Sequence, residues 1–95
     1  MAPASYAMFW WIGDGARRAG RIEFGDDHLD LASTSPTEEV ARIGFAEVAR
    51  VLLDRGLLNL ERRGHATVHI GSLDTPGALR ELADRVSDAT HERAL

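Results

Sequence analysis

The chain has 95 residues, of which 44% are hydrophobic and 27% charged, and its formal net charge is −4. This length fits one domain over residues 1–95, and the composition is typical of a folded chain rather than a disordered one. The acidic balance argues against binding to nucleic acid, and the lack of cysteine excludes disulfides, thiolate metal sites and a cysteine nucleophile.

The N-terminal region contains the most apolar part of the chain, Met8–Ile12. This run is far shorter than the roughly twenty apolar residues that span a bilayer, and no signal-peptide pattern accompanies it. We therefore expect a cytoplasmic protein with no transmembrane segment.

The first expected strand is Tyr6–Ile12, which ends at the turn Gly13-Asp14-Gly15. Neighbouring side chains of a strand leave through opposite faces, so Trp10 and Trp11 cannot enter the same core. One face carries Tyr6, Met8, Trp10 and Ile12, and the other carries Ala7, Phe9 and Trp11. Either another part of the chain buries Phe9 or Trp11, or these side chains form an exposed patch for a partner or for self-association.

Short segments with alternating burial continue the sheet. The expected strands are Arg21–Phe24, His28–Leu31, Ala41–Phe45, Val48–Leu53, Leu57–Arg62 and Thr67–Ile70. Their inward side chains are Ile22, Phe24, Leu29, Leu31, Ile43, Phe45, Val51, Leu53, Leu58, Leu60, Val68 and Ile70. We expect Thr67 and His69 to face water, and Ala32–Glu38 to form a polar loop.

One amphipathic helix is expected over residues 75–90, which makes the fold mainly β with a single C-terminal helix. Asp74 or Thr75 can cap its start, and Pro76 suits its first turn. The apolar stripe that should pack on the sheet consists of Leu79, Leu82, Ala83, Val86 and Ala89.

This order of about seven antiparallel strands followed by a helix resembles the pleckstrin-homology-like (PH-like) superfold, in particular its small single-domain forms from actinobacteria. The resemblance covers nearly the whole chain. It rests on an apolar strand, acidic corner and apolar strand over Ala41–Val51, and on Leu73–Leu79, which opens the helix. It implies a barrel or sandwich of two near-orthogonal sheets, one end plugged by the helix, and a binding or scaffolding role.

The resemblance also draws attention to three arginines. Relatives that bind phosphoinositides carry basic residues from the end of the first strand into the second, where this chain has Arg17, Arg18 and Arg21. The chain departs from that pattern because it has no lysine, is acidic overall, and places Asp14 and Glu23 close to the arginines. Ordinary solvated arginines on a surface hairpin are the alternative interpretation.

The remaining polar residues form no recognisable catalytic or metal-binding pattern. On an extended strand His65 and His69 lie about 13 Å apart, too far to share an ion. His28, beside Asp26 and Asp27, is typical of a turn, and the serines lie outside any nucleophile-elbow context. We therefore expect no catalytic residue, metal or cofactor.

Together these observations predict a non-enzymatic interaction or scaffold module that binds a protein partner, or itself as a homo-oligomer, through Phe9 and Trp11. The alternative is weak binding of anionic lipid headgroups through Arg17, Arg18 and Arg21. A third alternative, a small-ligand carrier or enzyme with a cavity inside the sheet, has no residue pattern in its favour.

Overall fold

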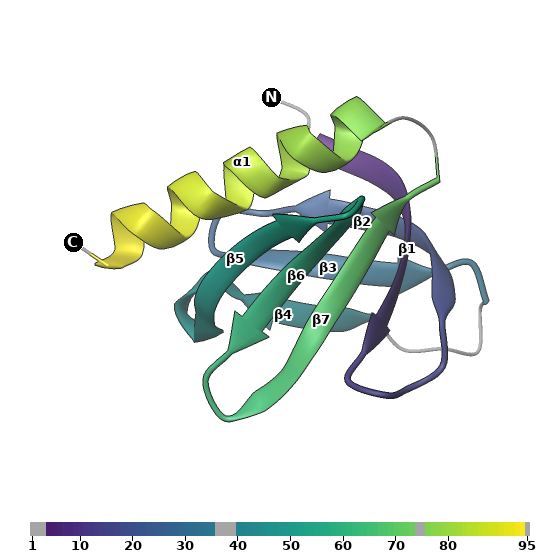
Figure 1. Cartoon of the computed structure of the whole chain (residues 1–95), viewed down its shortest axis with the longest axis horizontal. Helices are drawn as coiled ribbons and strands as arrows, with labels where there is room; N and C mark the ends of the chain where they lie inside the picture. The colour runs from purple at the N-terminus through teal and green to yellow at the C-terminus, as the bar shows by residue number, and fades with distance from the viewer. Residues whose placement is uncertain (1–3, 36–39, 74–75, 95) are drawn as a thin grey trace.

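The computed structural model describes residues 4–35, 40–73 and 76–94, which form a strand-rich domain with one long helix (Figure 1). The strands are β1 (Ala4–Ile12), β2 (Arg18–Phe24), β3 (His28–Ser33), β4 (Ala41–Gly44), β5 (Val48–Asp54), β6 (Leu57–Arg62) and β7 (His65–Ser72). A short 3-10 helix, η1 (Phe45–Glu47), joins β4 to β5, and the C-terminal helix is α1 (Pro76–Ala94). The acidic corner expected within Ala41–Val51 is therefore formed by η1.

The strands form one antiparallel sheet in the order β4-β3-β2-β1-β7-β6-β5. Residues Ala4–Trp10 of β1 pair with β2, whereas Met8–Ile12 pair with β7. Strand β1 thus passes from one half of the sheet to the other, and the two halves face each other as a sandwich (Figure 1). The two end strands β4 and β5 do not pair with each other in the described residues, so the sheet forms the sandwich of the prediction and not the closed barrel.

The core lies between the two halves and is built by the alternating side chains. Eleven inward residues of the strands and η1 are at most 2% exposed: Met8, Trp10, Ile22, Leu29, Leu31, Ile43, Phe45, Leu58, Leu60, Val68 and Ile70. The prediction that Leu53 is buried in the core is wrong, because its side chain is 42% exposed. Leu53 pairs with the buried Leu58, but β5 has a neighbouring strand on one side only.

Helix α1 lies across one end of the sandwich, where it contacts β5, η1, β7 and β6 (Figure 1). Its predicted apolar stripe is confirmed: Leu79, Leu82, Ala83 and Val86 are buried, and Ala89 packs against the core. The helix continues to Ala94, past the predicted end near residue 90, because a helical backbone can extend without an apolar stripe.

The predicted cap at Asp74 or Thr75 lies outside the described residues. The predicted loop over residues 32–38 begins later than expected, because Ala32 and Ser33 belong to β3, and its residues 36–38 lie outside the described residues. No helix within the described residues has the length and hydropathy that crossing a bilayer requires.

Candidate interaction surface

The outer face of β1 carries two aromatic side chains that take no part in the core. Phe9 and Trp11 are half-buried, while their neighbours Met8 and Trp10 point inward and are fully buried. The two outer rings are nearly parallel, with an interplanar angle of 8° and centroids 6.3 Å apart. The predicted division of β1 into two apolar faces is therefore confirmed.

Strand β7 extends this aromatic surface. His69 lies directly opposite Trp11 in the antiparallel pairing, and the two ring centroids are 4.9 Å apart. The Nδ1–H of His69 donates to Asn59 Oδ1 at 2.6 Å, which fixes the imidazole against the indole. His69 therefore lies on the outer face, as predicted, but stacking on Trp11 leaves its side chain half-buried.

Gly71 of β7 allows Phe9 to lie close to the sheet. It pairs with Phe9, and a Cβ placed on this glycine would lie only 2.1 Å from Phe9 Cζ. Any larger residue would therefore push the phenyl ring off the strand. The sequence offers a weak signal for this contact, since a glycine inside a strand often marks such a close approach.

Arginines from the β1–β2 hairpin complete the surface. The guanidinium carbon of Arg17 lies 4.8 Å from the Phe9 ring centroid and 5.0 Å from that of Trp11, within the range of cation–π attraction. Arg21, opposite Ala7 on β2, donates from Nε to Ser5 Oγ at 2.8 Å. We call the surface formed by Phe9, Trp11, Arg17, Arg21 and His69 the aromatic–arginine face.

Arg18 lies elsewhere, although the sequence grouped it with Arg17 and Arg21. It pairs with Trp10 in the β1–β2 register and lines a pocket of about 420 Å³ beside the β1–β2 turn. The other lining residues are Trp10, Trp11, Ile12, Gly15, Ala16, Leu31, Ser33 and Ala41, so that Arg18 is the single charged group among the described lining residues. The three predicted anion-binding arginines therefore do not converge on one point.

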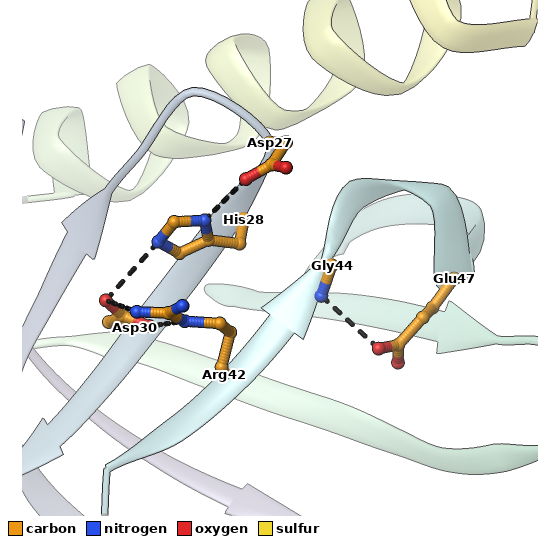
Figure 2. Close-up of polar contacts among 6 residues, drawn as sticks. All are labelled: Asp27, His28, Asp30, Arg42, Gly44 and Glu47. Carbon is orange, nitrogen blue, oxygen red and sulfur yellow. Dashed lines mark hydrogen bonds and ion pairs between the residues drawn. The ribbon is translucent and has the colours of Figure 1, made fainter.

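A separate polar cluster lies where β3 meets β4 (Figure 2). His28 contacts Asp27 through Nδ1 at 2.6 Å and Asp30 through Nε2 at 3.4 Å. The Arg42 guanidinium donates twice to Asp30, at 2.8 and 3.2 Å, and these hydrogen bonds hold the pKa of Asp30 below its ordinary value although burial opposes them. The charged groups of this cluster thus pair with one another across β3 and β4.

Glu47 of η1 plays a similar structural role next to this cluster. It accepts a hydrogen bond from the Gly44 N–H at 3.4 Å, as Figure 2 shows, and pairs with Arg62 at 3.5 Å. Within the described ranges, no group of histidine and acidic side chains is arranged to hold a metal ion. We therefore interpret the contacts of Glu47, Asp30 and Arg42 as structural: they hold the short strand β4 against β3 and η1.

No protein family model matches the sequence, and no curated protein does. Solved structures do resemble the fold. The N-terminal PH domain of human ARAP2 aligns over 98% of this chain and 83% of its own, with a TM-score of 0.77 and 8% sequence identity. The C-terminal domain of an unknown protein from Leishmania infantum aligns over 87% of this chain and 81% of its own, with a TM-score of 0.69 and 14% identity. Similarity at such low identity is informative about the fold alone. The chain therefore has the PH-like fold that its strand order predicted, while the actinobacterial kind of domain stays a prediction.

Proposed function

We propose that this chain is a non-enzymatic, cytoplasmic interaction module that binds a protein partner, or a second copy of itself, through the aromatic–arginine face. A PH-like fold commonly mediates interactions with proteins or lipids, which is compatible with a scaffold role. The observation that carries the proposal is the half-exposed row of Phe9, Trp11 and His69 on the side of β1 that does not serve the core.

The contacts that order Phe9, Trp11 and His69 support a role of these side chains in binding. The Trp11 ring stacks with those of Phe9 and His69, and His69 is hydrogen-bonded in turn to Asn59. Aromatic side chains that are already ordered lose little conformational entropy when a partner covers them. Tryptophan and arginine are also the residue types most often found at the energetic centres of protein interfaces.

The self-association form of the proposal is tested by light scattering coupled to size-exclusion chromatography. We expect the wild type to show a mass that rises above the monomer with concentration, and Trp11→Ser to stay monomeric. Leu53→Ser is the matched control, because Leu53 is exposed but lies on β5 and not on the aromatic–arginine face. Monomers in both the wild type and Trp11→Ser would remove self-association.

The partner form is tested by photo-crosslinking in cells of the source organism, with benzoylphenylalanine at position 9 or, as a control, at position 53. We expect defined protein adducts from position 9 that disappear when Trp11→Ser is added. Identical adducts from both positions would count against the proposal.

Binding to anionic lipid headgroups is the second candidate function. It is supported by the absence of any hydrogen bond or ion pair from Arg17 to the described residues, and by the position of Arg18 in the pocket beside the β1–β2 turn. Sedimentation with phosphatidylserine vesicles at low salt tests it, with Arg17→Ala and Arg18→Ala as the variants. Failure of the wild type to sediment would end this candidate.

A further inference from the structure

We infer that the aromatic–arginine face binds an acidic segment of a protein partner, with a partner carboxylate seated on the Arg17 guanidinium. The inference rests on the proposed function and adds the chemistry of the partner. It comes from the structure because the fold places Arg17 and Arg21, two of the three predicted hairpin arginines, on the same face of the sheet as the outer aromatics.

The Arg17 side chain is ordered by aromatic rings and not by a carboxylate. Its guanidinium lies over the rings of Phe9 and Trp11 and makes no hydrogen bond or ion pair with any residue that the structure describes. Arg42 and Arg62 differ, because each is already paired with a carboxylate, Asp30 and Glu47 respectively. A guanidinium held over aromatic rings by cation–π attraction uses none of its N–H groups as hydrogen-bond donors to other residues, so they can form a bidentate bond to a carboxylate.

The contacts with the two rings restrict the conformations of the Arg17 side chain before any partner binds. A free arginine loses much rotamer entropy when it is fixed by a ligand, but stacking on two rings limits this loss in advance. The rings themselves are positioned, since Phe9 lies against Gly71 and Trp11 against His69. A partner therefore meets a donor that is already oriented, beside indole surface that an apolar side chain of the partner can cover.

Charge complementarity identifies the partner as acidic. The five residues that define the aromatic–arginine face include two arginines and no carboxylate, whereas the whole chain carries a net charge of −4. The carboxylates nearest to these arginines in the sequence, Asp14 and Glu23, lie outside the five residues of the face. An acidic segment is thus attracted to this face and repelled by much of the remaining surface.

The inference is tested with two short blocked peptides, one in which Asp and Glu alternate with Leu, and one in which Asn and Gln replace the acids. Each is titrated into isotope-labelled protein while the Trp11 indole N–H and the Arg17 Nε–H are followed by NMR. We expect the acidic peptide to bind about tenfold more tightly than its amide counterpart, because a hydrogen bond to a charged group is worth more than a neutral one. Added salt should reduce this preference.

Variants assign the preference to Arg17. We expect Arg17→Ala to abolish the difference between the two peptides and Arg17→Lys to retain part of it. Arg80→Ala is the matched control, because it removes the same charge from an exposed position on α1 and should keep the wild-type preference. Equal binding of both peptides, binding of neither, or an equal effect of Arg80→Ala would overturn the inference.

The outcomes separate this inference from the proposed function. If both peptides bind equally and Trp11→Ser abolishes both, the face is an interaction surface but the carboxylate is not its ligand. If Trp11→Ser changes neither titration, the proposed function fails as well. Binding to phosphatidylserine vesicles that depends on Arg17 and is not competed by the acidic peptide would overturn the inference in favour of a lipid headgroup.

Discussion

Trp10 and Trp11 are adjacent residues of the same type that have opposite environments. Trp10 is 2% exposed in the core, while Trp11 is half-buried on the outer face. We expect Trp10→Ala to lower the free energy of unfolding by about 3–5 kcal/mol, as for other large core truncations. Trp11→Ala should cost about 1 kcal/mol, the value of its ring contacts. Urea unfolding measures both, and equal losses would show that the two faces of β1 are wrongly assigned.

Gly71 permits the packing of Phe9 and can be tested in the same way. In Gly71→Ala the new Cβ would overlap the Phe9 phenyl ring, so this ring must move away from β7 and its stacking with Trp11 is disturbed. We expect a loss of about 1–3 kcal/mol in the free energy of unfolding, the usual cost of overpacking, and a weaker near-ultraviolet circular dichroism signal.

A double variant shows whether this cost arises from Phe9. Combining Phe9→Ala with Gly71→Ala should destabilise by less than the sum of the two single variants, because the ring that clashes has been removed. If the two losses of unfolding free energy simply add, the cost of Gly71→Ala comes from the backbone at position 71 and not from a clash with Phe9.

Among the elements, β4 is a short edge strand that depends on polar contacts for its attachment. Asp30 of β3 and Arg42 of β4 pair directly in the register, and their side chains form the bidentate bond seen in Figure 2. The pKa of Asp30 is lowered by this bond relative to its ordinary value of 3.8. Its contribution to stability is therefore present above that pH and is lost as the pH falls through the folded-state pKa.

We therefore expect part of the loss of thermal stability in acid to come from the Asp30–Arg42 ion pair. Asp30→Asn and Arg42→Gln should each lower the melting temperature near neutral pH and show a shallower fall in melting temperature below about pH 4 than the wild type. Asp84→Asn, at an exposed position on α1, should keep the wild-type profile. Unchanged acid sensitivity in Asp30→Asn would contradict the role of the β3–β4 ion pair.

At the scale of the whole molecule, strand order predicts which parts open first. Strands β1, β2 and β7 lie at the centre of the sheet, and β4 and β5 lie at its two ends. Amide hydrogen exchange should be slowest in β1 and β7 and fastest in β4, with β5 in between because α1 packs on it. The pattern can be read residue by residue by NMR, and protection in β4 equal to that in β1 would contradict it.

The fold could be predicted because many local patterns agree with one architecture. Alternation placed Ile22, Leu31, Leu60 and Ile70 in the core, and the stripe of α1 was equally regular. Such patterns report which face is buried but not which strands are neighbours across the sheet. The failure of the sheet to close, and the exposure of Leu53 at its edge, depend on that long-range pairing.

The candidate surface was predictable only in part, for the same reason. Phe9 and Trp11 followed from the period of β1 alone. The stacking of His69 on Trp11 requires the register between β1 and β7, which no local pattern specifies. The position of Arg17 over the rings depends on how the hairpin turn returns the chain, so the sequence kept the aromatics and the arginines as separate hypotheses.

The place of β1 between β2 and β7 also bears on how the protein is made. During synthesis β2 follows β1 at once, but β7 leaves the ribosome only after the five intervening strands. Until then the nascent chain exposes one hydrogen-bonding edge of its most hydrophobic strand, a state that favours mispairing with other chains. Pairing of β7 with β1 therefore ends the period in which a newly made copy exposes this edge, and α1 is the one described element that is still to be added.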